Sequence, residues 1–393
     1  MDGLIDPGTA SAQIDLAAFR ANIGAVAEVA TGAQVMVVVK ADAYGHGMLP
    51  CAVAARQAGA SWLGVATPAE ALALRAGGDT GRVLTWLYGP EEDLVPVVAA
   101  DIDVTASTPE QVDQLARAAR SAGIVARLQL KADTGLSRNG APPAAWPELC
   151  RVAAAAERSG RARVTGLWSH FAAADEPGHP SIALQQENFR IAERVAADAG
   201  LDPELRHLAN SAGALIVPDA RLDLVRIGIA AYGIDPAPGV AALAGVSLRP
   251  VMRLRARLAN VKRIPAGSGV SYGWIWTAPR DTVVGLVPLG YADGIPRQAG
   301  NRAEVGWRGQ RVPVRGQICM DQFVVELGPG ADAEIGEEVV VFGPGDDGGP
   351  TAEDWAAHAG TIGYEIVTRI GARVPRVYRD GVDRHGSDRT EEG

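Results

Sequence analysis

Lys40 is the residue whose type and position most directly suggest chemistry. It follows an apolar run at residues 35–39 and precedes Tyr44 and His46 in the segment VVVKADAYGHG. An amine delivered by a buried strand into a crowded turn loses the hydration of its charged form, which lowers the lysine pKa. A neutral amine is the form that attacks an aldehyde. Lys40 is therefore a candidate for a Schiff base with an aldehyde cofactor.

Other reactive side chains also follow apolar runs, namely Lys131, His170, Asn210 with Ser211, and Arg226. In a barrel of parallel strands the active site lies where the strands end, because the connecting loops gather there. A single Lys or Arg at such a place is most simply a rim residue that extends its charge into solvent. The joint placement of all of them favours one shared site.

A glycine segment after the last of these runs, RIGIAAYG, could hold a phosphate. Gly228 permits a close approach of the backbone, and the amides of Gly228 and Ile229 can donate to a dianion. Ser211 would add a hydroxyl from the neighbouring loop. Taken by itself, such a segment is also compatible with an ordinary barrel turn.

The elements that would position these groups alternate along residues 35–235. Alanine-rich stretches of helical length separate eight apolar runs of strand length: residues 35–39, 62–66, 83–87, 102–105, 126–130, 164–168, 205–208 and 222–225. Thr67 and Thr108 each begin a helix signature with an N-cap hydroxyl, a proline at the first position and a capping-box partner. The pattern predicts an N-terminal (β/α)8 TIM barrel over residues 12–240, whose first strand-like segment near 12–16 could join the other domain.

The composition changes after residue 240. Valine-rich runs punctuated by glycine predict strands at residues 282–288, 304–315 and 338–342, with one late helix near 361–370. We therefore predict an α/β fold class in which a C-terminal mostly-β domain, residues 241–380, follows the barrel. The polar residues 381–393 are predicted to form a loose tail.

Bulk composition excludes several classes of function. The net charge of the 393 residues is -9 and Lys+Arg number only 37, without the basic stripe that nucleic-acid binding requires. No apolar run reaches the length of a membrane span, and the first residues lack the pattern of a secretory leader, so a cytoplasmic protein is expected. Three dispersed cysteines without C-x-x-C spacing give no support for disulfides or a metal site.

Nine segments together resemble the alanine racemase family, in its order and spacing. VVVKADAYGHG resembles the cofactor-lysine signature of that family. The others are LKADTGLSRNG, GLWSHFAAADE, HLANSAG, VRIGIAAYG, GVSYG, PLGYADG, ICMDQ and GTIGYEIVTRIGARVPRVY. The resemblance spans roughly residues 12–378, and GVSYG and ICMDQ fall in the predicted β domain.

The resemblance implies a pyridoxal 5'-phosphate enzyme that interconverts L- and D-alanine and supplies D-alanine for peptidoglycan. Lys40 would carry the cofactor and act on one face of the substrate. Tyr272, from the partner subunit of a homodimer, would act on the other face. A phenol normally loses its proton only near pH ~10, and the family pattern places His170 and Arg226 in the network that assists it. Arg226 would also face the pyridine nitrogen and disfavour its protonation.

The same resemblance assigns the remaining site residues. It implies that the cofactor is bound by Tyr44, His170, Asn210, Ser211, Arg226, Gly228, Ile229 and Tyr364. Arg138 and the amide of Met320 would hold the substrate carboxylate, and Lys131 resembles a lysine that many members carry as a carbamate. The residues expected at the entrance are Asp175, Tyr291, Arg297 and Ile362. Three positions depart from the frequent family residue: Gln317 where arginine is frequent, Gly363 for asparagine, and Ser137 for glycine.

Three alternatives stay open at this point. A racemase of the same mechanism could prefer serine or accept a broader range of small amino acids. A pyridoxal-phosphate decarboxylase could share the barrel and β domain, although such enzymes usually pair the ring nitrogen with a carboxylate, where this chain has Arg226. A carrier of the cofactor without catalysis would not need Tyr272 or the second domain.

Overall fold

The chain forms two compact units. The structure, a computed structural model, describes residues 8–380. One unit comprises residues 20–248, and the other joins the chain up to Phe19 to the chain from Arg249 onward. The predicted tail at 381–393 lies outside the described residues.

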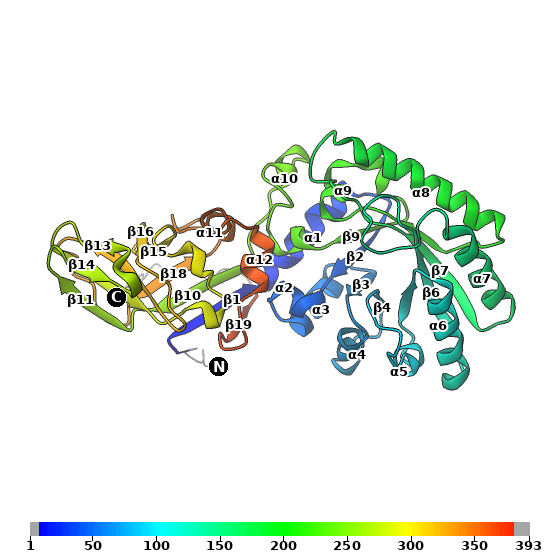
Figure 1. Cartoon of the computed structure of the whole chain (residues 1–393), viewed down its shortest axis with the longest axis horizontal. Helices are drawn as coiled ribbons and strands as arrows, with labels where there is room; N and C mark the ends of the chain where they lie inside the picture. Colours follow the sequence, from blue (N-terminus) through cyan, green and yellow to red (C-terminus); the bar gives the residue numbers. More distant parts are fainter. Residues whose placement is uncertain (1–7, 381–393) are drawn as a thin grey trace, which may run out of the picture. The chain divides into compact units, whose positions relative to one another are not determined.

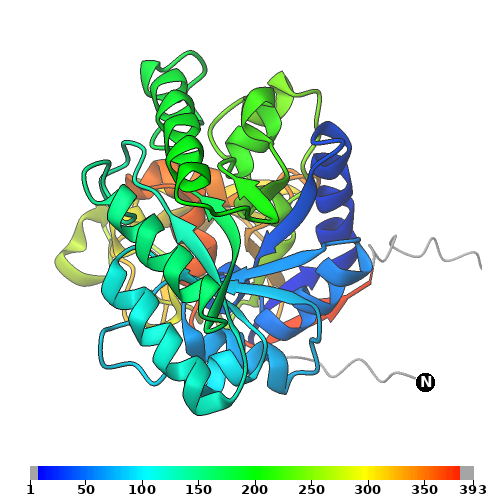
Figure 2. The same ribbon diagram turned by 90° about the vertical axis from the view of Figure 1, so that its right-hand side faces the viewer.

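The unit of residues 20–248 is built on eight parallel strands, which lie among the helices in Figures 1 and 2. Their order is β8-β7-β6-β5-β4-β3-β2-β9. Two backbone hydrogen bonds, from Asp223 to Arg206 and from Arg226 to Ala209, join the two end strands and close the ring. The predicted eight-stranded barrel is confirmed. The strands are β2 (Gln34–Val38), β3 (Trp62–Val65), β4 (Arg82–Thr85), β5 (Asp103–Ala106), β6 (Ala126–Lys131), β7 (Ala162–Trp168), β8 (Leu205–His207) and β9 (Leu224–Ile227).

Helices lie outside these strands (Figure 2). The α-helical segments are α1 (Leu16–Val29), α2 (Lys40–Tyr44), α3 (Met48–Gln57), α4 (Pro68–Ala76), α5 (Val95–Ala99), α6 (Pro109–Ala122), α7 (Trp146–Arg158), α8 (Pro180–Asp198), α9 (Ser211–Ile216) and α10 (Val240–Leu243). Short 3-10 turns occupy η1 (Pro218–Ala220) and η2 (Ile229–Tyr232). In β3 and β5 every residue is buried, as expected of parallel strands covered on both faces.

The two predicted helix starts are found where the sequence placed them. Thr67 caps α4 with a complete capping box to Glu70. Thr108 caps α6, but the Gln111 side chain accepts from the Ser107 amide instead of closing the box on Thr108. Both helices begin with proline.

The last strand of the barrel begins later than predicted. Leu222 has a φ of 47°, a left-handed conformation that a strand cannot contain, and β9 begins only at Leu224. Arg226 therefore lies within β9 and not after it, as the sequence had suggested. Its side chain is 4 % exposed. This correction matters because strand residues have better-defined directions than loop residues.

The other unit contains a nine-stranded sheet of order β11-β14-β17-β16-β15-β18-β10-β1-β19. The N-terminal strand β1 pairs antiparallel with β10 and parallel with β19, so the segment near 12–16 belongs to this sheet. Its strands are β1 (Ala10–Asp15), β10 (Met252–Arg257), β11 (Asn260–Ile264), β14 (Thr282–Val287), β15 (Glu304–Trp307), β16 (Gln310–Arg315), β17 (Phe323–Gly328), β18 (Glu338–Phe342) and β19 (Arg376–Arg379). A separate pair is formed by β12 (Gly269–Val270) and β13 (Trp276–Thr277).

Two features of this unit differ from the prediction. The single strand expected at 304–315 is a hairpin, because Arg308 and Gly309 both adopt positive φ and turn the chain between β15 and β16. The helix expected near residues 361–370 is present as α12 (Gly363–Thr368), and a helix that was not predicted, α11 (Ala352–Ala359), precedes it. Short 3-10 turns lie at η3 (Tyr272–Trp274), η4 (Tyr291–Asp293) and η5 (Arg297–Ala299). No helix in residues 8–380 has the length and apolar character needed to cross a membrane.

Candidate active site

Lys40 opens an unusual turn directly after β2. The four residues from Ala41 to Tyr44 all have φ of 52–53°, so the chain makes a left-handed turn that L-residues adopt only at a cost. Hydrogen bonds hold it in place. The Ala41 amide donates to Glu70 at 2.6 Å, and the Asp42 carboxylate accepts from the Met48 amide at 2.7 Å. The turn fixes the direction in which Lys40 and Tyr44 leave the strand.

The surroundings of Lys40 favour its neutral amine. Burial lowers the pKa of Lys40, the positive charge of Arg138 lowers it further, and Glu70 opposes both. The ammonium nitrogen lies 5.9 Å from the centre of the Trp86 ring. The expected nucleophilic amine is therefore present at the end of the first barrel strand.

A cradle for an anion lies beside the turn. The Ser211 hydroxyl accepts from the Gly228 amide at 2.9 Å, and a Cβ on Gly228 would lie 2.6 Å from the Tyr44 hydroxyl oxygen. Only glycine leaves space at that point. Two hydroxyls and a backbone amide thus meet at the start of η2, and this donor set fits the phosphate of pyridoxal phosphate. Asn210 caps α9 by accepting from the Gly213 amide at 2.9 Å.

Arg226 is held by neutral acceptors. Its guanidinium donates to the ring nitrogen Nδ1 of His207 at 3.0 Å and lies 3.1 Å from Nδ1 of His170. It also donates to the carbonyl oxygens of Ser169 and Leu208. Among the described residues no carboxylate lies within ion-pair distance of it. Burial lowers the pKa of Arg226 to about 9, which leaves a buried cation at neutral pH.

Lys131 is the last residue of β6 and is buried beside other cations. Burial lowers the pKa of Lys131 to about 7, and the charges of Arg226 and Arg138 act in the same direction. Its amine lies 4.2 Å from the centre of the Trp168 ring. His170 likewise has a pKa well below its usual value, because of burial and then of Arg226, Arg138 and the two lysines. A cluster of this sign attracts an anionic ligand.

The loop after β6 carries Arg138. The Asp133 carboxylate accepts from the amides of Gly135 and Ser137 at 3.0 Å each. Ser137 has a φ of 55°, a conformation that glycine adopts without strain. Ser137, which stands where glycine is frequent in the family, therefore adopts a backbone conformation that costs more for serine than for glycine.

Tyr272, Tyr291 and Met320 belong to the second unit. Three of its loops are tied together: the Ser271 hydroxyl donates to the Gln317 carbonyl at 2.7 Å, and the Tyr291 amide donates to the Cys319 carbonyl at 3.1 Å. A Cβ on Gly290 would lie 2.2 Å from the Met320 carbonyl oxygen. These loops present Tyr272, Trp274 and Met320, which are 73 %, 73 % and 53 % exposed.

The remaining predicted positions are divided between the two units. Asp175 lies in the loop after β7 of the barrel, whereas Arg297, Ile362 and Tyr364 lie at η5 and at the start of α12. The structure brings together two groups of predicted barrel residues. One is Lys40, Lys131, Arg138, His170 and Arg226, and the other is Tyr44, Ser211 and Gly228. The structure places the predicted residues within 272–364 in the other unit.

Several buried residues of the barrel were not singled out by the sequence. Glu70 holds the Lys40 turn, Trp168 lies against Lys131 and Arg226, and His207 accepts from Arg226. Gln129 is a further residue that was not singled out. The alternating sequence of β6, ARLQLK, could have identified it, because the polar residues of this strand lie on one face.

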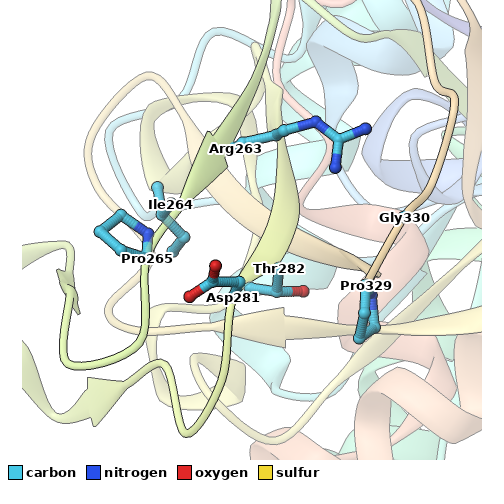
Figure 3. A pocket seen from close by; sticks show the side chains of 7 residues that line it. All are labelled: Arg263, Ile264, Pro265, Asp281, Thr282, Pro329 and Gly330. Carbon is cyan, nitrogen blue, oxygen red and sulfur yellow. The ribbon is translucent and has the colours of Figure 1, made fainter.

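A separate hollow lies at an edge of the nine-stranded sheet. This cavity of about 380 Å³ is lined by Arg263, Ile264, Pro265, Asp281, Thr282, Pro329 and Gly330 (Figure 3). None of the residues described above lines it. No group of His, Cys, Asp and Glu in residues 8–380 is arranged to hold a metal ion.

Comparison with known proteins accounts for both units. Residues 14–236 match the family model "Alanine racemase, N-terminal domain", and residues 251–378 match "Alanine racemase, C-terminal domain". An alanine racemase of Streptomyces coelicolor is 58 % identical over 374 residues, 94 % of this chain and 95 % of that protein. One from Thermobifida fusca is 52 % identical over 373 residues, 95 % of this chain and 99 % of that protein.

Solved structures agree with the family models. The crystal structure of alanine racemase from a D-cycloserine-producing Streptomyces lavendulae has a TM-score of 0.92 and 53 % identity, covering 96 % of this chain and 98 % of that one. The Bacillus anthracis alanine racemase with bound L-Ala-P has a TM-score of 0.87 and 31 % identity, covering 94 % of this chain and 95 % of that one.

Proposed function

The chain belongs to the alanine racemase family, and on that premise we propose that Lys40 and Tyr272 are the two groups that exchange the α-proton of alanine. Its activity is the pyridoxal-phosphate-dependent interconversion of L- and D-alanine, and the protein is an isomerase. The observation that carries the assignment of residues is the cluster of cations Lys40, Lys131, Arg138 and Arg226. Lys131 and Arg226 are buried in it, and Lys40 has a lowered pKa.

The barrel residues would hold the cofactor by its two ends. Tyr44, Ser211, Gly228 and Ile229 would bind the phosphate, while Asn210 supports that end by capping α9. The resemblance to the family also assigns Tyr364 to the phosphate. Lys40 would anchor the aldehyde carbon. When bound, the cofactor supplies an electron-withdrawing ring that acidifies the α-hydrogen of the amino acid.

Arg226 would set the electronic character of that ring. A guanidinium has donors only, so it cannot accept a proton from the pyridine nitrogen and keeps that nitrogen unprotonated. Its own direction is fixed by acceptors on β8 and on the loop after β7. The weaker electron withdrawal favours return of the α-proton over transamination. A decarboxylase, which would need a carboxylate there, is disfavoured by the same residue.

Two bases on opposite faces of the substrate would then move the proton. Lys40 Nζ would take or return it on one face and Tyr272 Oη on the other, each acting as acid when its counterpart acts as base. Arg138 and the Met320 amide would bind the substrate carboxylate and keep the α-carbon between them. His170 is held neutral, and its Nδ1 faces the donor-only guanidinium of Arg226, so its hydrogen is on Nε2, from which it would donate to the Tyr272 oxygen.

Lys131 would act as an anion after carbamylation. A neutral amine adds to carbon dioxide with loss of a proton, and a lysine with a pKa of about 7 has a substantial neutral fraction at physiological pH. The resulting carbamate would pair with Arg138 and orient it. Without the modification the two cations repel each other.

We further propose a homodimer with shared active sites, in which Tyr272 and Met320 reach the barrel of the partner subunit. The exposure of Tyr272, Trp274 and Met320 supports this assembly. Asp175, Tyr291, Arg297 and Ile362 would line the entrance. A cytosolic supply of D-alanine for peptidoglycan is the proposed setting. Gln317 stands where arginine is frequent in the family, so the chain lacks a positive charge at that position. A serine racemase or a racemase of broad specificity is therefore the second candidate.

A direct assay tests these assignments. The full chain with pyridoxal phosphate should convert L-alanine into D-alanine, measured by chiral chromatography, and should exchange the α-hydrogen in heavy water. Lys40→Ala should lose both activities and the visible absorbance of the lysine-bound cofactor. A panel of other amino acids in the same assay separates an alanine-specific from a broad racemase. Turnover that survives in Lys40→Ala would contradict the assigned base.

A further inference from the structure

A series of buried polar side chains leads from Arg226 toward the other end of the barrel. His207 Nε2 lies 2.8 Å from the amide oxygen of Gln129, and the Gln129 nitrogen lies 3.5 Å from the Asp103 carboxylate. His207, Gln129 and Asp103 are each 0 % exposed. They stand on three different strands, β8, β6 and β5. Of these three, the site described above uses only His207, as an acceptor for Arg226.

The chemistry of Arg226 determines which nitrogen of His207 carries the proton. A guanidinium has only donors, so His207 Nδ1, 3.0 Å away, must accept. A neutral imidazole then has its hydrogen on Nε2 and donates it to Gln129. The pKa of His207 is held well below its usual value by burial, then by Arg226 and Lys131, which keeps the ring neutral. Trp168 stacks on the ring at an interplanar angle of 6° and fixes its plane.

The Gln129 amide could satisfy the opposite tautomer only if it were reversed. Its oxygen would then face Asp103 and its nitrogen would face His207. An amide oxygen beside a buried carboxylate is unfavourable because both groups are acceptors. Asp103 therefore selects the orientation in which Gln129 accepts from His207.

The rest of the barrel fixes Asp103 and leaves room for Gln129. Arg82 lies 3.2 Å and Arg127 2.9 Å from the carboxylate, and the Thr165 hydroxyl donates to it. A Cβ on Gly166 would lie 3.0 Å from the Gln129 amide carbon and 3.1 Å from its oxygen. The glycine in β7 thus provides the space that the amide occupies.

We infer that Asp103 and Gln129 are positioning residues that hold His207 as a hydrogen-bond acceptor, so that Arg226 keeps its direction without a carboxylate partner. The inference rests on the proposed function, in which Arg226 faces the cofactor ring. A carboxylate paired directly with Arg226 would neutralise its charge in the site. The series Asp103–Gln129–His207 supplies the orientation and leaves the charge in place.

The tautomer of His207 is the readout for this inference. If Asp103 and Gln129 served only to pack the barrel, their substitution would not change that tautomer. In the cofactor-free protein labelled with nitrogen-15 histidine, His207 should show one protonated and one unprotonated nitrogen, with the proton on Nε2. The signal is assigned by its loss in His207→Asn. In Asp103→Asn the new carboxamide has both a donor and an acceptor, so it can hydrogen-bond Gln129 in either orientation of the Gln129 amide. Both tautomers of His207 should then appear. In the holoenzyme kcat should fall on the order of tenfold with a smaller change in KM.

Two further variants keep the test decisive. Gly166→Ala, whose backbone conformation suits alanine, displaces Gln129 without removing a charge and should give the same mixture of tautomers. Asp101→Asn is the matched control, since Asp101 pairs with Arg127 at 2.9 Å, is exposed, and has a φ of 52° that asparagine tolerates. It should leave the His207 tautomer unchanged.

Each other outcome has a defined meaning. A wild-type His207 protonated on Nδ1 or on both nitrogens overturns the inference, as does a single Nε2 tautomer in both Asp103→Asn and Gly166→Ala. A wild-type protein with the Nε2 tautomer but no racemisation would contradict the proposed function and not the Asp103–Gln129–His207 assignment.

Discussion

At the scale of single residues, Arg226 is the group on which reaction specificity would depend most. Its neighbours are neutral imidazoles and carbonyls, and its charge lowers the pKa of Lys131. Arg226→Glu places an acceptor where only donors stood, so the pyridine nitrogen of the cofactor could be protonated. We expect kcat for racemisation to fall about 10²-fold, the order found for loss of a preorganised charge-stabilising group, and pyruvate from transamination to rise.

The measurement for Arg226→Glu is the ratio of D-alanine to pyruvate formed from L-alanine. Arg206→Glu is the control, because Arg206 lies on the surface of the same barrel, where it is half-exposed and pairs with Asp223. Unchanged racemisation without pyruvate in Arg226→Glu would show that this residue does not influence the ring.

Lys131 gives a prediction about stability and pH. Its folded pKa of about 7 lies below the ordinary value of 10.5. Between these values the unfolded chain holds a proton that the folded chain has released. Lys131 therefore makes the free energy of unfolding rise with pH in that window, by at most about 1.4 kcal/mol per pH unit, and its destabilising effect is greatest at and below pH 7.

Urea unfolding of the cofactor-free protein in carbonate-free buffer measures this effect. The difference between Lys131→Met and the parent protein should favour the variant near pH 7 and shrink toward pH 10. Bicarbonate should reduce the difference at pH 7 by converting the lysine into its carbamate. A difference that does not depend on pH would mean that the Lys131 pKa is not lowered.

At the scale of elements, the turn after β2 depends on a helix of the next βα unit. Glu70, in the first turn of α4, accepts from three amides, those of Ala41, Ala66 and Thr67. A glutamine has one oxygen, so Glu70→Gln turns an NH2 group toward a backbone N–H. We expect a loss of about 1–3 kcal/mol in stability and a further fall in the Lys40 pKa, because Glu70 raises it.

The rate at which Lys40 binds pyridoxal phosphate, followed against pH, reports that change in Glu70→Gln. Gln111→Ala is the matched control, because Gln111 stands at the equivalent position of α6 and accepts only from the Ser107 amide there. Gln111→Ala should destabilise the start of α6 without changing the pH dependence of pyridoxal phosphate binding by Lys40. Equal profiles for Glu70→Gln and the parent protein would argue against any link between α4 and Lys40.

Helices and strands that are determined by nearby residues could be predicted from the sequence, and those that depend on other features could not. The alternation of apolar runs and alanine-rich helices predicted the barrel, and the signatures at Thr67 and Thr108 predicted two helix starts. The hairpin at Arg308 and Gly309 was missed because a positive φ at arginine has no signature in composition. The capping box of Thr351 and Asp354, which begins α11, was a usable signal that was overlooked.

The candidate site was predictable in the same uneven way. Strand ends and family motifs identified Lys40, Lys131 and Arg226, whose chemistry is visible in the residue type. The partners Gln129 and Asp103 were not identified, because their role depends on which strands become neighbours inside a closed barrel. Glutamine and aspartate inside apolar strands are informative only once that closure is known.

At the scale of the whole molecule, the proposed dimer predicts complementation between inactive chains. Lys40→Ala lacks the barrel base and Tyr272→Phe lacks the base of the other unit. In a hybrid dimer one of the two sites is intact, so equal mixing should restore about a quarter of the wild-type sites. Activity after subunit exchange, with exchange itself followed by native mass spectrometry, is the measurement.

A mixture of Lys40→Ala with Arg138→Ala provides the control for complementation. Both changes lie in the barrel unit, so every site of a hybrid has one defective barrel and no activity should return. If Lys40→Ala with Tyr272→Phe also gives no activity despite proven exchange, each site is built within one chain.

The left-handed turn has a consequence for the chirality of its own backbone. Residues 41–44 have φ near the value that D-amino acids prefer, and each L-residue there costs roughly 1–2 kcal/mol. Ala41 is exposed, so its methyl group has little packing to lose. A semisynthetic protein with D-alanine at position 41 should unfold at a higher temperature than the natural chain, whereas D-alanine at Gly24 in right-handed α1 should lower that temperature. D-alanine would then be the better building block at the residue directly after Lys40.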